Sequence, residues 1–244
     1  NTGILFFTRE PERFLPQAIV QCVRYKGIIK MDIEDQKDMA SDIITNIDEI
    51  FVFLRRSLDV AFKFESGNPT RIEVWEIPYI ALKEAVINAI AHRDYINKGT
   101  HIQVEVFDDR VSITNFGGLV KGLSKDELRK RSMHRNPNIV NMLHRSNFIE
   151  KLGTGLIRID SELEKAGLPK AEFEISDYWF SIVFKRKKIY KFKDDENFIA
   201  FHNAMYRHTH RNVNDYLYYD MQDKFYRRIF EYNNKNNIMY VVKI

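Results

Sequence analysis

The chain has 244 residues, of which 44% are hydrophobic and 30% charged, a composition that excludes general disorder and suffices for a large domain with a smaller appendage. Its 38 basic and 34 acidic residues leave a net charge of +4, so total charge alone predicts no generic grip on nucleic acid. No stretch without Asp, Glu, Lys or Arg exceeds ten residues, which is too short for a membrane helix. The single cysteine, Cys22, has no partner for an internal disulfide, which fits a reducing compartment. We therefore expect a soluble, cytoplasmic protein with no membrane partner, and the first residue, Asn1, suggests that further domains precede it.

We expect three parts: 1–70, 71–188 and 189–244, of which the last is set apart because all glycines and prolines lie at or before Pro169. In the first part, Gly3–Phe7 and Ala18–Tyr25 read as strands, and Asp38–Leu58 carries apolar residues at helical spacing. The last part has no glycine or proline and is rich in Tyr, Phe and Asn, which predicts one or two helices with an aromatic face. The expected fold class is α+β, with an N-terminal α+β connecting segment and a helical C-terminal appendage.

The central part alternates between strand and helix signals. Pro78 is suited to the start of a helix, and Ser124 with Glu127 forms a capping box that predicts a helix near Leu128–Arg131. Further helices are expected after Pro137 and after Gly155. The predicted strands are Arg71–Trp75, a hairpin around Asp108 with apolar residues alternating on both sides, and Trp179–Lys185.

The predicted helix Ala81–Tyr95 has apolar residues around nearly its whole circumference, so it should be covered on most sides. Glu84, Asn88 and His92 nevertheless follow one another at intervals of four residues, which places them on one stripe. A carboxylate, an amide and an imidazole that point to one place favour a cavity for a ligand or water. The alternative is a stripe that faces solvent or makes ordinary core hydrogen bonds.

Two glycine segments follow. Asn115, Gly117 and Gly118 end the hairpin, where paired glycines allow a close approach of backbone to a ligand or simply form a turn. The segment Lys151–Gly155 reads Lys-Leu-Gly-Thr-Gly and opens a helix, and backbone N–H groups at such a start form a natural phosphate seat. Between them, residues 120–135 carry a local charge of +4, typical of a solvated helix face or of a segment that closes over phosphate.

This order of motifs resembles the nucleotide-binding domain of the GHKL ATPases, the superfamily of gyrase, heat-shock chaperone, histidine kinase and MutL. More closely, EAVINAIAHRDY, ITNFGG, RNPNIV and EKLGTGLIRI resemble the C-terminal region of RecG-like ATP-dependent helicases and of transcriptional regulators that carry a Schlafen-type AlbA DNA-binding domain. The resemblance covers about residues 1–186. It implies a Bergerat-type α/β sandwich that binds ATP and Mg²⁺, with contact to DNA through a domain outside this chain.

The resemblance also implies roles for individual residues. Glu84 matches the catalytic glutamate that would deprotonate water, and Asn88 matches the asparagine that holds Mg²⁺ against the phosphates. The adenine contact falls on Asn115, where most of the superfamily has an aspartate. The remaining nucleotide-binding candidates are Gly117, Gly118, Gly153, Thr154 and Gly155, with Arg131, Arg135 and Lys151 as phosphate or lid candidates.

The first hypothesis is an ATP-Mg²⁺ binding regulatory module of a DNA-associated transcriptional regulator, in which ATP orders the lid Lys121–Leu152 and shifts homodimerisation or the attached DNA-binding domain, with slow hydrolysis as a further step. The alternatives are an assembly or dimerisation module without nucleotide chemistry, which Asn115 favours, and a nucleic-acid surface on the aromatic tail. A conventional helicase motor is excluded, because the nearest approach to a Walker A loop, Gly117–Ser124, has Leu123 in place of the lysine.

Overall fold

A computed structural model describes residues 2–64, 71–131, 133–149, 154–186, 189–190 and 240–241. The chain divides into two compact units, Asn1–Arg186 and Lys187–Ile244. Of the second unit, the described residues are the strands β9 (Ile189–Tyr190) and β10 (Tyr240–Val241), which pair in parallel. The predicted aromatic helices of the tail lie outside the described residues, and the division of the first unit at residue 70 stays a prediction.

The first unit is built on a six-stranded sheet with the strand order β2-β1-β5-β6-β8-β7. Every neighbouring pair in it is antiparallel except β1 and β5, which run in parallel with Val20 opposite Ile102. The strands are β1 (Val20–Lys26), β2 (Asp32–Met39), β5 (Ile102–Val106), β6 (Arg110–Phe116), β7 (Glu172–Ile175) and β8 (Trp179–Lys185). The fold class is thus mixed α and β with a mostly antiparallel sheet, as the sequence predicts.

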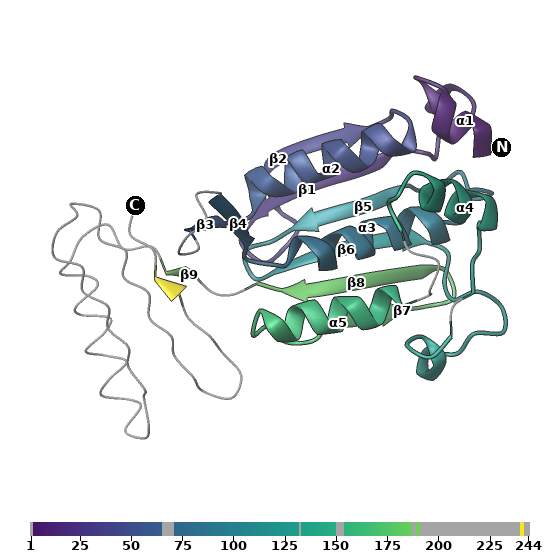
Figure 1. Ribbon diagram of the computed structural model, residues 1–244. Helices are drawn as coiled ribbons and strands as arrows, with labels where there is room; N and C mark the ends of the chain where they lie inside the picture. Colours follow the sequence, from purple (N-terminus) through teal and green to yellow (C-terminus); the bar gives the residue numbers. More distant parts are fainter. Residues whose placement is uncertain are drawn as a thin grey trace, which may run out of the picture. The chain divides into compact units, whose positions relative to one another are not determined.

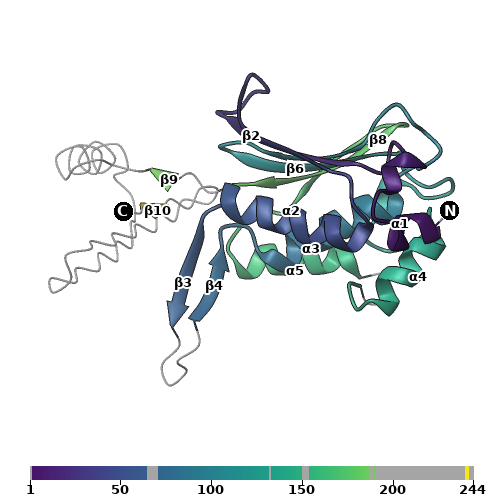
Figure 2. The ribbon, with the colours of Figure 1, turned by 90° about the horizontal axis from the view of Figure 1, so that it is seen from above.

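Three helices lie on one face of this sheet: α2 (Ile43–Ser57), α3 (Tyr79–His92) and α5 (Gly155–Lys165), as Figures 1 and 2 show. Alternation along the strands sets the two faces apart. Val104 and Ile113 pair across β5 and β6 and are buried toward the helices. On the opposite face, the hydroxyl groups of Ser112 and Ser181 are 3.0 Å apart.

Helix α3 is the centre of the core. Eight of its apolar residues, Ala81, Leu82, Ala85, Val86, Ile87, Ala89, Ile90 and Ala91, are at most 3% exposed, whereas Tyr79 and Ile80 in its first turn are 42% exposed. The expectation of a helix covered on most sides is therefore confirmed. Burial of apolar surface is the dominant favourable term in folding. It holds α3 in one orientation about its axis, and this sets the direction in which the polar residues of its stripe point.

The smaller elements frame this body. Helix α1 (Thr2–Phe7) precedes the sheet, and a short 3₁₀ turn spans Pro11–Arg13. Strands β3 (Val60–Phe64) and β4 (Arg71–Trp75) form a separate antiparallel hairpin that projects from the helical layer (Figure 2). Helix α4 (Pro137–Arg145) lies between β6 and α5 in the chain and contacts α3.

Two local predictions are wrong. Residues 3–7 form a helix, because β1 already has a partner on each side and a short apolar run does not by itself distinguish strand from helix. The capping box of Ser124 and Glu127 is present, but it opens a 3₁₀ turn at Lys125–Glu127 and no α-helix at residues 128–131. The sequence analysis also missed β2, β3 and β7, of which β2 is a polar, largely exposed edge strand.

A buried ion pair closes the first unit at its last described residue. Nε of Arg186 lies 2.5 Å from Oε1 of Glu76, with both side chains at most 8% exposed. Burial raises the pKa of Glu76, and the charge of Arg186 opposes that rise. The pair joins the end of β8 to the connection between β4 and α3. None of the helices in the described part of the chain is both long and apolar enough to cross a membrane.

Candidate nucleotide site

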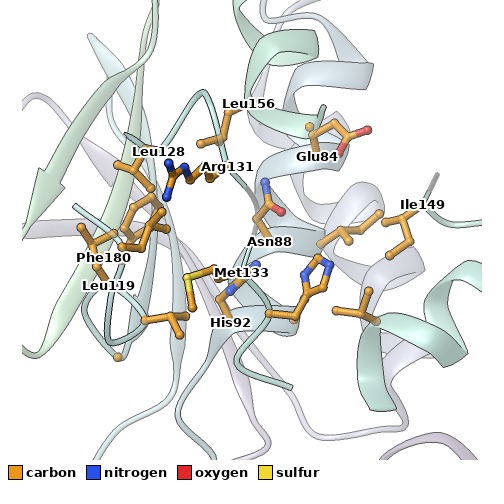
Figure 3. A pocket seen from close by; sticks show the side chains of 18 of the residues that line it. Glu84, Asn88, His92, Leu119, Leu128, Arg131, Met133, Ile149, Leu156 and Phe180 are labelled. Carbon is orange, nitrogen blue, oxygen red and sulfur yellow. The ribbon is translucent and has the colours of Figure 1, made fainter. Parts of the chain in front are cut away.

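Glu84, Asn88 and His92 line one cavity of about 370 Å³ beside α3 (Figure 3). Their spacing places them on successive turns of the same helix face, so the stripe seen in the sequence points into a pocket. A volume of this size lies within the range of small-molecule sites, about 300–1,000 Å³.

The start of α5 approaches this stripe closely. A Cβ atom at position 155 would lie 2.8 Å from Oε2 of Glu84 and 3.6 Å from Nδ2 of Asn88. Thr154 and Gly155 both line the cavity, whereas Lys151 and Gly153 lie outside the described residues. The structure therefore brings Glu84, Asn88, Thr154 and Gly155 together at the N-terminus of a helix, where the dipole favours anions.

Glu84 is also ion-paired across the cavity. Nη1 of Arg158 on α5 lies 3.2 Å from Oε1 of Glu84, and the two side chains are 33% and 12% exposed. The sequence analysis missed Arg158 as a site residue. Its position in the chain, one turn after Gly155, was the available signal, because residues three apart share a helix face.

His92 is a neutral group at physiological pH. Burial lowers its pKa from 6.5 to about 4, and the nearby His134 and Arg135 add to this effect. The rings of His92 and His134 are 5.9 Å apart between centroids, and both residues line the cavity. His92 can thus offer a donor or an acceptor nitrogen there, but no positive charge.

The glycine turn after β6 forms another wall. Gly117 and Gly118 line the cavity, and Gly117 has a φ of +116°, a value that favours glycine. The backbone N–H of Gly117 donates to the carbonyl of Tyr178 at 2.7 Å. Arg135 packs over Gly117 and donates from Nη2 to the carbonyl of Gly118 at 2.9 Å.

Asn115 lies elsewhere. Its side chain is 1% exposed, it does not line the cavity, and its Nδ2 makes long contacts of 3.4 and 3.5 Å to the carbonyl oxygens of Phe116 and Gly117. Arg135 likewise does not line the cavity, while Arg131 does. The side chain of Arg131 is 72% exposed and pairs with Glu127.

Apolar side chains make up most of the rest of the wall, with the polar Asn141 among them, and the sequence did not single them out. Figure 3 shows Leu119 and Phe180 on one side of Asn88 and Ile149 on the other. An apolar wall with a few convergent polar groups is the usual make-up of a small-molecule site.

A second missed residue, Asn136, supports the site from behind. Its Nδ2 donates to the carbonyl oxygens of Ala91 at 2.9 Å and Arg93 at 2.7 Å, so it satisfies groups at the C-terminal end of α3. Arg93 is fully buried and donates to the carbonyl oxygens of Asp94, Asn97 and Thr100. The side chain of Asn136 in the RNPN motif thus holds the backbone at the HRDY motif, which follows directly on the end of α3.

Among the described residues, no three His, Cys, Asp or Glu side chains are grouped to hold a metal ion. Asn88 supplies an oxygen-bearing side chain next to the helix start. Mg²⁺ is commonly held by one or two such groups together with phosphate oxygens, so Asn88 fits a magnesium ion that arrives with a nucleotide.

Residues 99–184 match a family model described as "Putative ATP-dependent DNA helicase recG C-terminal". The resemblance to the RecG-like C-terminal family is confirmed. The match to this RecG-like family begins after α3, so it includes the turn at Gly117 and the start of α5 but neither Glu84 nor Asn88.

The fold also resembles that of a solved structure, the DIP2311 protein from Corynebacterium diphtheriae, with a TM-score of 0.63 and 17% identity. The likeness covers 76% of this chain and 37% of that one, so this chain spans well under half of that protein. At this identity it supports the fold alone. None of the curated proteins compared with the chain matches it.

Proposed function

We propose that the cavity binds ATP together with Mg²⁺ and that the RecG-like region is the regulatory nucleotide module of a DNA-associated transcriptional regulator. The observation that carries the proposal is the meeting of Glu84, Asn88 and Gly155 at the start of α5 in one cavity. The match to an ATPase-like family supports the same ligand, and the helical layer on one sheet face is consistent with a Bergerat-type sandwich.

The phosphates belong at the N-terminus of α5. The first N–H groups of a helix have no acceptor within the helix, so they and the helix dipole favour an anion there, and Asn88 on α3, whose amide lies beside Gly155, would hold Mg²⁺. The bound ion would neutralise phosphate charge. The apolar wall that includes Leu119 and Phe180 suits the flat base.

Slow hydrolysis is the chemical step that the site could support. Oε2 of Glu84 lies 2.8 Å from the position that a Cβ atom of residue 155 would take, beside the start of α5. Glu84 is therefore the residue that would orient water and accept its proton. An ion-paired carboxylate is a weaker base, so Glu84 must part from Arg158 before it can act. Binding can then act as a switch on the lid 121–152, on homodimerisation and on an attached DNA-binding domain.

One observation favours a second candidate, an assembly module without nucleotide chemistry. Asn115, at the position that would contact adenine, is buried in β6 just before the turn and does not line the cavity. The experiment below separates the two candidates.

The test is the melting temperature of the chain with and without millimolar Mg²⁺-ATP. A ligand at about 100 times its Kd adds about 2.7 kcal/mol of stability, which corresponds to a rise of roughly 5 to 10 °C in a domain of this size. Asn88→Ala should abolish the rise, whereas the matched variant Asn138→Ala, on an exposed residue outside the cavity, should keep it. No rise in the unaltered chain would overturn nucleotide binding and favour the assembly module.

A further inference from the structure

Arg158 and Glu84 form a contact between two helices that are far apart in the chain. Arg158 lies one turn into α5, and its Nη1 is 3.2 Å from Oε1 of Glu84 on α3. The side chain of Arg158 is one-third exposed, so solvent screens its charge only in part, and it lines the same cavity as the carboxylate.

The carboxylate of Glu84 occupies the place where an anion is most favoured. Its Oε2 would touch a Cβ atom at position 155, which puts it directly against the first residue of α5. A phosphate group at the same helix start would repel this carboxylate. A nucleotide phosphate that enters there must therefore displace Glu84 from its position.

Arg158 is the cation that such a phosphate would meet. Of the Arg and Lys residues described along the cavity, Arg131 is largely exposed and pairs with Glu127, whereas Arg158 is the more buried. His92 is neutral near pH 7 and adds no charge. Arginine binds phosphate in a bidentate manner, and a phosphate carries more negative charge than one carboxylate.

We propose that Arg158 selects nucleotides by their terminal phosphate, with its guanidinium leaving the carboxylate of Glu84 to bind that phosphate. The inference rests on the proposed nucleotide site and goes beyond it, because it assigns the preference for a triphosphate to one side chain. In this proposal the terminal phosphate of a triphosphate is the one that reaches the carboxylate of Glu84, so a nucleoside diphosphate, shorter by one phosphate, leaves Arg158 paired with Glu84. The exchange also frees Glu84 only when the terminal phosphate is present, so binding of the correct nucleotide and release of the base are one event.

Calorimetric titration of the full chain with Mg²⁺-AMP-PNP, a non-hydrolysable triphosphate, and with Mg²⁺-ADP tests this inference. Arg158→Ala should weaken the triphosphate by about tenfold or more and ADP by less than about threefold, so the preference collapses. Arg158→Lys, which keeps the charge without the bidentate geometry, should retain part of it. Arg145→Ala, which removes a charge from an exposed residue of α4 outside the cavity, should leave both affinities unchanged.

A double-mutant cycle with Glu84→Gln tests the exchange itself. In the unaltered background this variant should tighten the triphosphate several-fold, because it removes the competing carboxylate. When Arg158→Ala is already present, Glu84→Gln should raise the affinity for the triphosphate by a smaller factor. That factor comes only from the lost repulsion between the Glu84 carboxylate and the phosphate. If Arg158→Ala does not fold, as judged by circular dichroism, Arg158→Lys and Glu84→Gln still decide the question.

The outcomes separate the two claims. If the unaltered chain binds nucleotide and Arg158→Ala weakens triphosphate and diphosphate equally or not at all, the role of Arg158 is wrong and the nucleotide site stands. If the unaltered chain binds neither nucleotide, both claims are wrong.

Discussion

The two ends of helix α3 meet different kinds of neighbour. At its C-terminal end the contacts involve backbone: Asn136 donates to the carbonyl oxygens of Ala91 and Arg93, and the backbone N–H of Asp94, just past the helix, donates to the carbonyl of Phe116 at 2.8 Å, next to the turn at Gly117 and Gly118. Nearer its N-terminus the contacts join side chains, because Glu84 and Asn88 lie against Gly155 and Glu84 pairs with Arg158.

Because the neighbours differ, Gly118 and Gly155 are glycines for different physical reasons. Gly118 and Gly155 look alike in the sequence, since each belongs to a glycine pair beside the predicted site. In the structure a Cβ at position 118 would collide with the carbonyl oxygens of Ser176 and Asp177, which cannot turn away, whereas a Cβ at 155 would meet the flexible end of Glu84. The first glycine is required by packing of the backbone, and the second leaves room for site side chains.

The largest expected effect is on Gly118. Gly118→Ala forces two segments of backbone apart, and we expect it to lower the free energy of unfolding by about 3 kcal/mol. Urea denaturation measures this loss. The matched control is Gly99→Ala, whose Cβ would meet only an ordinary contact at 3.5 Å, and it should stay within about 0.5 kcal/mol of the parent. Equal stability of both variants would show that the turn can relax and would break the comparison.

An intermediate effect is expected from acid at His92. Its pKa is about 4 in the folded chain and 6.5 in the reference state, so between these values the unfolded chain binds the extra proton. Neutral His92 therefore contributes stability that is complete above pH 6.5 and is lost progressively as the pH falls toward 4, and at about pH 5 the loss is about 2 kcal/mol. Urea unfolding at several pH values, compared with His92→Gln, isolates this contribution. Parallel curves for the two proteins would contradict it.

The smallest effect on stability is expected at Gly155. Gly155→Ala displaces only the end of Glu84 and places a better helix former at the start of α5, so the free energy of unfolding should change by less than about 0.5 kcal/mol. If the proposed nucleotide site is right, affinity for Mg²⁺-AMP-PNP should fall by about tenfold, because the added methyl group lies at the helix start where we propose that the phosphates bind. Unchanged affinity, measured by calorimetry, would place the ligand away from the start of α5.

The spacing of apolar residues and the order of the motifs along the chain predicted much of the fold and part of the candidate site. The buried helix α3, its polar stripe, the hairpin β5–β6 and the helices after Pro137 and Gly155 all follow from local spacing. Edge strand β2 did not, because most of its residues face solvent and show no apolar alternation. The pair Glu84–Arg158 was out of reach too, since it depends on how two helices 74 positions apart in the sequence are set against each other. Asn115 matched its motif position, yet its amide faces the carbonyl groups of its own turn rather than the cavity.

The parallel pairing of β1 with β5 has a consequence for how the chain folds. Residues 20–24 must find residues 102–106, and everything between them, including α2, the β3–β4 hairpin and α3, has to be accommodated within that loop. Contacts of such long sequence separation form slowly, since the entropy of closing the loop is lost before the contacts stabilise it. During synthesis β1 and β2 are made before β5 and can pair with each other first. The other edge of β1 has no strand partner until β5 has been synthesised. The six-stranded sheet that carries the pocket beside α3 is therefore complete only after that long-range step.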